Sequence, residues 1–307
     1  MGRTLRESKV KKFVSSFLSF YQSAETDITS VAVGYYLTVS IFPILMTMAS
    51  LLPYLQFDVK QILDFIKDFI PVKLYPTAAN IVTSVLSRPS PTWLGISIAT
   101  TLWTISRSMN ALQKAFNKAY GVEKHRDMII SYIVGFFLGV AIYALITLSA
   151  IMVAFGNTLL QSLINWLQLE DGFFRSLLNQ TELAVYVTLF LGLVLLYFFL
   201  PNVRIRKMRF ALPGAIFVML VMGTVGQFFG LYVESYADKL LDFRFVTAVI
   251  ILVFMLWSVF LANILIIGAV LNATIQHYFV DEFTHRRGDV ISVFQRMKQI
   301  ISKKEES

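Results

Sequence analysis

The feature that most constrains this chain is a set of long segments without charged side chains. A helix that crosses the hydrocarbon core of a bilayer needs roughly 20 consecutive, mostly apolar residues. Segments that lack Asp, Glu, Lys and Arg and approach or exceed this length lie at 28–55, 91–106, 128–155, 183–200, 210–233 and 245–273, of which the second is the shortest. The sequence therefore predicts an all-α fold, a polytopic membrane helix bundle with six transmembrane helices.

The composition also favours a membrane protein. Of the 307 residues, 56% are hydrophobic and 15% are charged, whereas soluble domains average about 45–50% apolar and about 25% charged residues. A water-soluble fold has too little interior to bury so much apolar surface. The 27 Phe and 13 Tyr residues suit positions that face lipid or the lipid-water interface.

The distribution of Lys and Arg predicts the orientation of the spans, because cytoplasmic connections of membrane proteins carry an excess of positive residues. Segments 1–27, 107–127, 201–209 and 274–307 together hold 20 of the 27 Lys and Arg residues. The other three connections hold the remaining 7. This alternation predicts a multi-pass protein of the bacterial inner (cell) membrane with both termini in the cytoplasm.

Several segments outside the spans have apolar residues at helical spacing. In 10–21 they accompany the N-terminal lysines, which predicts an amphipathic helix on the inner interface. Residues 62–86 predict an outer interfacial helical hairpin, broken between Pro71 and Pro76, and 159–167 predict a third interfacial helix. The predicted organisation is a cytoplasmic amphipathic N-terminal helix at 1–27, a six-helix membrane domain at 28–273 and a cytoplasmic C-terminal tail at 274–307.

The polar residues that best fit a binding site form one stripe on a predicted helix. The stripe consists of Arg107, Asn110, Lys114, Asn117 and Lys118, at spacings of 3, 4, 3 and 1 residues. It is a candidate site for an anionic headgroup or substrate, and Arg204 in the basic link 201–209 is a further candidate. The alternative is membrane anchoring, in which the cations follow the cytoplasmic interface and extend toward water.

Pro43 stands in the middle of the first apolar segment. A proline inside a helix removes a hydrogen bond, so the sequence predicts a kink with freed carbonyl groups. Such a break can form part of a binding site, and Pro43 and the nearby Tyr35 and Tyr36 are candidate substrate contacts. The alternative is a structural kink that is packed by neighbouring helices.

The six apolar segments contain no Asp, Glu, Lys or Arg. Ionisable side chains inside a membrane mark proton and ion pathways, so their absence disfavours a carboxylate proton relay. Two pairs of glycines have the GxxxG spacing, which predicts close approach of helices. These pairs are Gly135 with Gly139 and Gly226 with Gly230.

The sequence offers no recognisable catalytic constellation. It has no cysteine, and its 3 histidines are not spaced as metal ligands. It contains no P-loop, nucleophile elbow or dinucleotide fingerprint. We therefore expect no enzyme, no metal and no cofactor. The expected partners are membrane lipids and an anionic or amphipathic substrate, and not nucleic acid.

Four stretches of sequence carry a family resemblance in their order and spacing. They are Val31–Tyr36 with Phe42 and Pro43; Trp103–Arg107 with Asn110–Leu112 and Asn117–Tyr120; Tyr197 and Leu200–Val203 with Leu212–Ala215; and Leu256–Trp257 with Gly268–Ala273. In these stretches the chain resembles the YihY/BrkB family of bacterial inner-membrane proteins, once widely labelled ribonuclease BN. The resemblance implies six helices with cytoplasmic termini. It also implies a virulence or serum-resistance factor, or a transporter of lipids or other envelope compounds.

The chain departs from this family pattern in its last apolar segment. The family often reads Gly-Ala-Glu-Leu-Asn-Ala there, whereas Val270 stands at the acidic position in this sequence. No role of that carboxylate is therefore carried over. Gly268, Asn263 and Asn272 remain candidates for polar contacts or close packing.

Three functions follow from these observations. The leading hypothesis is a transporter or flippase-like protein for an amphipathic or anionic envelope compound, motivated by the six helices, the interrupted first span and the basic stripe. The second is a non-transporting membrane scaffold for cell-envelope machinery. The third is a membrane nuclease, which the sequence disfavours because it offers neither metal ligands nor an acid-base pair for phosphodiester cleavage.

Overall fold

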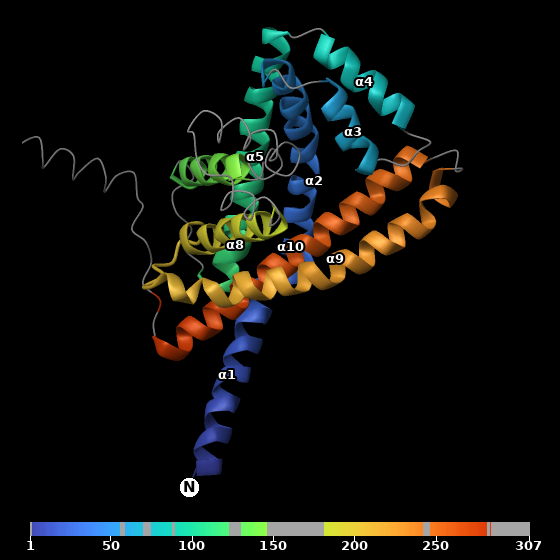
Figure 1. Cartoon of the computed structure of the whole chain (residues 1–307). Coiled ribbons are helices and arrows are strands. Elements are labelled where there is room, and N and C mark those ends of the chain that lie inside the picture. Colours follow the sequence, from blue (N-terminus) through green and yellow to red (C-terminus); the bar gives the residue numbers. More distant parts are fainter. Residues whose placement is uncertain are drawn as a thin grey trace, which may run out of the picture. The chain divides into compact units, whose positions relative to one another are not determined.

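The computed structural model of the chain describes residues 2–55, 59–69, 75–87, 90–122, 130–145, 181–241, 246–280 and 283. In this part of the chain the secondary structure is helical (Figure 1), which confirms the predicted all-α class. The helices are α1 (Gly2–Ala24), α2 (Thr26–Leu51), η1 (Leu52–Leu55), α3 (Val59–Phe69), α4 (Tyr75–Ser87), α5 (Pro91–Ala119), the apolar helix Ile130–Leu145, α8 (Thr181–Phe199), η2 (Met208–Phe210), α9 (Leu212–Leu241) and α10 (Val246–Phe279).

Within the described residues, three helices are long and apolar enough to cross a membrane, at Thr26–Leu51, Met208–Phe228 and Ile251–Phe279. They correspond to the first, fifth and sixth apolar segments of the sequence. Two shorter apolar helices, Ile130–Leu145 and Tyr186–Phe199, correspond to the third and fourth segments. The second segment lies within α5, which is not among the helices that meet these requirements of length and hydropathy. The count of six spans therefore stays a prediction.

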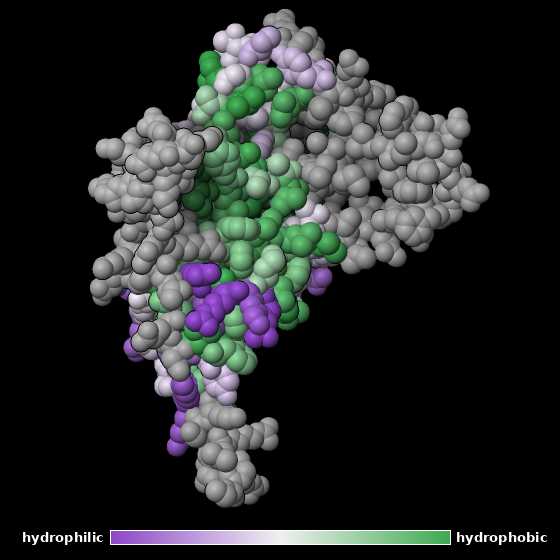
Figure 2. Space-filling view, turned by 90° about the vertical axis from the view of Figure 1, so that its left-hand side faces the viewer, coloured by the Kyte–Doolittle hydropathy of each residue, from purple (hydrophilic) through white to green (hydrophobic). Residues whose placement is uncertain are grey.

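Large apolar side chains are exposed on these helices. Phe42 and Leu45 on α2, Leu220 and Phe228 on α9, and Leu256 on α10 are examples. On the face shown in Figure 2, hydrophobic residues form a broad surface, and strongly hydrophilic residues gather toward one end of it. Extended apolar surface of this kind is unusual on a soluble monomer and is suited to contact with lipid.

Helices are present in two of the three segments with amphipathic spacing. Residues 10–21 lie in α1, residues 62–69 lie in α3 and residues 75–86 lie in α4, and α3 and α4 contact each other. The third segment, 159–167, lies outside the described residues, as does most of the predicted tail. The interfacial location of these helices and the domain boundaries proposed at residues 27 and 273 stay predictions.

The chain divides into two compact units. Unit 1 comprises Met1–Thr38, Ile105–Gly139 and Leu193–Ser307, and unit 2 comprises Val39–Thr104 and Val140–Gly192. The division passes through α2 and α5, so each of these helices contributes residues to both units. All candidate site residues except Pro43 belong to unit 1.

Close backbone packing joins three helices of unit 1. A Cβ atom added to Gly214 of α9 would lie 2.3 Å from the carbonyl oxygen of Gly268 on α10. One added to Gly268 would lie 2.2 Å from the hydroxyl oxygen of Tyr197 on α8. This hydroxyl donates a 2.8 Å hydrogen bond to the carbonyl oxygen of Leu265, and the Tyr197 ring stacks on that of Phe116 from α5. Glycine at both positions allows α8, α9 and α10 to meet at one point.

The two predicted GxxxG pairs differ in their surroundings. A Cβ at Gly139 would lie 2.2 Å from Cγ2 of Ile105, and one at Gly135 would lie 3.3 Å from Cβ of Met109. The helix Ile130–Leu145 therefore packs closely on α5, as predicted. A Cβ at Gly226 would meet no atom of the described residues within 4 Å, so no close approach is seen there in the described part of the chain.

Pro43 lies inside α2 and does not end it. The helix runs from Thr26 to Leu51, and Pro43 is half-buried within it. A helix that continues past a proline still lacks the hydrogen bond that the missing N–H would donate. The kink expected here and the use of freed carbonyl groups stay predictions.

We expect Gly214→Ala and Gly268→Ala each to destabilise the protein by about 1–3 kcal/mol, the usual cost of forcing an extra methyl group into filled space. Gly223→Ala on α9 is the matched control, because a Cβ there meets no described atom within 4 Å. The midpoint of thermal unfolding of the full-length protein in detergent measures the difference. Equal midpoints for the three variants would show that the close approach of α9 and α10 contributes little to stability.

Candidate functional site

A cavity of about 310 Å³ lies in unit 1 beside α5. Its lining combines cations, an amide, a hydroxyl, two aromatic rings and small or aliphatic side chains. The lining residues are Arg107, Lys114, Lys118, Asn110, Thr29, Tyr36, Tyr132, Ile28, Ala32, Ala111 and Ala115. The lining therefore combines basic and amide side chains with apolar ones.

The helical periodicity of α5 explains how the polar side of the cavity forms. Arg107, Asn110, Lys114 and Lys118 follow one another at intervals of three or four residues, so they share a helix face. The residues expected on the opposite face are buried: Met109, Leu112, Phe116, Ala119 and Tyr120. The two cations Arg107 and Lys114 are exposed on the polar face.

Asn110 is the least solvated polar residue in the lining. Its side chain is only 9% exposed, and its Nδ2 atom is buried without a hydrogen-bond partner among the described residues. A buried amide donor without a partner costs about 1–3 kcal/mol, and such groups are uncommon in native structures. Asn110 thus lines the cavity, while its unused donor lies behind the cavity surface and would reach a ligand only if the amide turned.

Aromatic groups and a cation form another part of the wall. The guanidinium of Arg107 lies over the ring of Tyr132, with its Cζ 5.9 Å from the ring centroid, at the range of a cation-π contact. The backbone of Tyr36 is tied to α5 because the Ser108 hydroxyl donates a 2.9 Å hydrogen bond to its carbonyl oxygen. These contacts connect α2, α5 and the helix Ile130–Leu145 around the cavity.

An ion pair connects the end of α5 to the junction of α1 and α2. The ammonium of Lys118 lies 2.5 Å from a carboxylate oxygen of Glu25, and the Ser23 hydroxyl donates to the carbonyl oxygen of Lys118 at 2.9 Å. Glu25 has a φ of 46°, a conformation uncommon for residues other than glycine. Both charged side chains are substantially exposed, so the ion pair contributes little stability, about 0–1 kcal/mol. It does partly neutralise the charge of Lys118 beside the cavity.

Asn117 belongs to the predicted stripe but does not line the cavity. Its side chain is 2% exposed, and its Oδ1 accepts a 2.7 Å hydrogen bond from the backbone N–H of Asn202. Gln113, which the sequence analysis did not single out, donates from Nε2 to the carbonyl oxygen of Leu200 at 2.7 Å. Both amides therefore bind the backbone that follows α8.

Two amides of α10 bind the same connection from the other side. Asn272 is fully buried; its Oδ1 accepts from the N–H of Gly214 at 2.7 Å and its Nδ2 donates to the carbonyl oxygen of Ala211 at 3.3 Å. Asn272 thereby binds the N–H of Gly214 and the C=O of Ala211 at the start of α9. An N-cap residue usually binds the free N–H groups at such a helix start. Gln276 donates from Nε2 to the carbonyl oxygen of Arg204 at 3.3 Å.

The remaining candidates are not among the residues that line the cavity. Tyr35 is exposed, with its ring edge-on to that of Tyr36 at 5.4 Å between centroids. The Arg204 side chain is exposed, Asn263 on α10 is half-buried, and Pro43 belongs to unit 2. Of the candidate residues, the cavity thus contains Tyr36, Arg107, Asn110, Lys114 and Lys118. Val270, at the family's acidic position, is fully buried.

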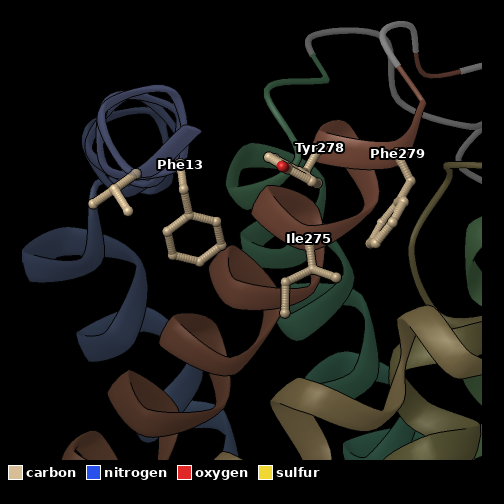
Figure 3. Close-up of a pocket in the computed structure, with 5 residues that line it drawn as sticks. Phe13, Ile275, Tyr278 and Phe279 are labelled. Atoms are coloured by element: carbon tan, nitrogen blue, oxygen red, sulfur yellow. The ribbon is translucent and has the colours of Figure 1, made fainter. Parts of the chain in front are cut away.

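A second hollow of about 320 Å³ lies between α1 and α10. Val10 and Phe13 of α1 line it, together with Ile275, Tyr278 and Phe279 of α10. Figure 3 shows Phe13 on one side of Ile275 and Phe279 on the other. Its lining contains no charged side chain, so it differs in chemistry from the basic cavity.

Asn117 and Asn110 offer a matched test of structural and ligand-binding roles on one helix. Asn117→Ala should destabilise the protein by about 1–3 kcal/mol, because the buried N–H of Asn202 loses its acceptor. Asn110→Leu should leave stability unchanged or slightly raised, because no partner of Nδ2 is lost. Thermal unfolding of both variants in detergent provides the comparison. A similar loss in both would assign Asn110 a structural role.

Comparison with known proteins identifies the family to which the chain belongs. A family model described as "Virulence factor BrkB" matches residues 17–290. A Bacillus subtilis (strain 168) protein named as ribonuclease-like protein YfkH is 26% identical over 262 residues, which cover 85% of this chain and 94% of that protein. No solved structure gives a significant match. Because the family model covers most of the sequence, including α2, α5, α9 and α10, this chain belongs to the BrkB family.

Proposed function

We propose that this protein is an inner-membrane transporter or flippase-like protein for an amphipathic or anionic envelope compound. The observation that carries the proposal is the cavity beside α5. Arg107 and Lys114 provide positive charge there, and Ile28, Ala32 and Ala111 provide apolar surface. A ligand with an anionic head and an apolar body would satisfy both sides of this lining.

The buried Asn110 favours ligand binding over membrane anchoring. Anchoring requires only cations with flexible stems that reach the charged surface of the bilayer. It gives no reason for a buried amide donor without a partner between those cations. A polar ligand inside the cavity would supply the missing acceptor.

A non-transporting scaffold for envelope machinery is the second candidate. The observation that favours it is the row of exposed apolar side chains on α1, which would suit a partner protein or the membrane surface. This row consists of Val10, Val14, Leu18 and Tyr21. Crosslinking in cells distinguishes the two candidates, because a scaffold should give stable protein adducts and tolerate loss of Arg107.

We propose no enzymatic role, although the Bacillus relative is named as ribonuclease-like. Phosphodiester cleavage needs a metal-activated nucleophile or an acid-base pair, and the sequence suggests neither. An RNA-cleavage assay of the purified protein, with and without divalent metal ions, tests this view. Cleavage that is lost on substitution of a single residue of this chain would overturn it.

The proposed topology has six spans in the inner membrane and both termini in the cytoplasm. Because the chain has no cysteine, single introduced cysteines report exposure without background. We expect a membrane-impermeant thiol reagent to label Ser87→Cys and Ser176→Cys in intact cells. It should label Lys207→Cys and Ser302→Cys only after the cells are opened. Labelling of Ser302→Cys in intact cells would reverse the assigned orientation.

In proteoliposomes, the protein should accelerate the transfer of a fluorescent phosphatidylglycerol between leaflets, followed by dithionite quenching. Arg107→Gln and Lys114→Gln should each slow this transfer by roughly fivefold, because one basic residue contributes about 1 kcal/mol to binding an anionic lipid surface. Lys207→Gln is the control, since Lys207 is exposed outside the cavity. Equal rates with and without protein, for this lipid and for other anionic amphiphiles, would remove the support for transport.

A further inference from the structure

The donors around Asn110 point to a particular chemical group in the ligand. We infer that the cavity binds the phosphate group of an amphiphile, with Asn110 Nδ2 as a direct hydrogen-bond donor. This inference rests on the proposed function and makes its substrate class more specific.

The first step concerns the kind of donor. The Asn110 side chain is nine-tenths buried and its Nδ2 atom has no partner among the described residues, although it lines a cavity that also contains Arg107 and Lys114. A neutral amide can be buried at far lower cost than an ammonium group. The Asn110 amide can therefore be more deeply buried than Arg107 and Lys114, and it can recognise an oxyanion through a directed hydrogen bond. We expect ligand binding to turn the amide about its Cβ–Cγ bond toward the cavity.

The second step concerns the shape of the acceptor. Arg107, Asn110 and Lys114 lie on successive turns of one helix face, so their donors approach a shared ligand from different levels along the axis. A planar carboxylate presents two oxygens in one plane. A tetrahedral phosphate presents oxygens in three dimensions, and the forked guanidinium of arginine is suited to binding two of them. The arrangement therefore favours phosphate over carboxylate.

The third step concerns the rest of the ligand. Lys118 is paired with Glu25, so its charge is partly neutralised. Ala32 on α2 and Ala111 and Ala115 on α5 keep the adjacent wall small and apolar. Apolar side chains can contact a hydrocarbon chain, but they provide no hydrogen bond to a free phosphate ion. An amphiphile uses both parts of the lining.

The test compares ligands that differ only in the anionic group. Full-length protein in phosphatidylcholine nanodiscs is titrated with dihexanoyl phosphatidic acid, with dihexanoylglycerol hemisuccinate, which carries a carboxylate on the same chains, and with inorganic phosphate. We expect phosphatidic acid to bind at least about tenfold more tightly than either of the others. Asn110→Leu should weaken its binding by roughly tenfold to a hundredfold, the effect of losing a hydrogen bond to a charged group.

Two variants keep this test interpretable. Asn110→Asp preserves the shape of the side chain but repels an anion, so it should abolish phosphatidic acid binding. Its unfolding midpoint should fall below that of the native protein, because a carboxylate costs more to bury than an amide, and binding is therefore measured at a temperature at which the variant stays folded. Lys114→Gln should weaken binding of both lipids, since it removes charge without changing the shape of the donor set.

The outcomes separate this inference from the proposed function. Equal affinity for the phosphate and carboxylate lipids, or unchanged binding in Asn110→Leu, overturns the phosphate assignment while transport of anionic amphiphiles remains supported. Inorganic phosphate binding as tightly as the lipid overturns the amphiphile assignment. Failure of the native protein to bind any of the three overturns both the inference and the proposed function.

Discussion

The organisation of unit 1 depends on satisfying the backbone that connects α8 to α9. This connection runs from Leu200 to Ala211 and contains one short helix, η2, so its N–H and C=O groups cannot all bind one another. Leu200, Asn202 and Ala211 are buried, and a buried backbone group without a hydrogen-bond partner is costly. Amide side chains from α5 and α10 bind it at Leu200, Asn202, Arg204, Ala211 and Gly214. These hydrogen bonds fix the positions of α5 and α10 relative to the connection.

Asn110 differs from the amides that bind the backbone of this connection. Three amides of α5, at positions 110, 113 and 117, are buried within little more than two helical turns. Gln113 and Asn117 bind backbone groups of the connection, whereas the Nδ2 of Asn110 has no partner in the described part of the chain. Asn110 also faces the cavity that holds Arg107 and Lys114. The three amides of this helix therefore differ: two bind backbone groups of the connection, and the third is the one to which we assign ligand binding in our proposal.

The family membership and the basic cavity give different information about the protein. Membership in the BrkB family places the chain among proteins described as virulence factors and supplies no reaction. The cavity supplies the chemistry, namely positive charge, a buried donor and apolar surface within one space. The apolar hollow between α1 and α10, lined in part by Phe13 and Phe279, has none of the polar groups that this chemistry requires. Our proposal of transport of an anionic amphiphile therefore rests on the residues that line the basic cavity.

Sequence alone determined the features that depend on composition and local spacing. The apolar segments required membrane-type helices, and the three- and four-residue spacing from Arg107 to Lys118 required that these residues share a helix face, since both follow from helix geometry and transfer energies. Tertiary structure decided which polar residues face a cavity and which bind backbone. Asn110 and Asn117 are the same residue type on the same helix, seven positions apart, and only the position of Asn202 gives Asn117 its partner. Likewise Gly139 and Gly226 share a motif, but among the described residues a close neighbour is found at Gly139 and not at Gly226, because spacing along one helix does not reveal what packs against it.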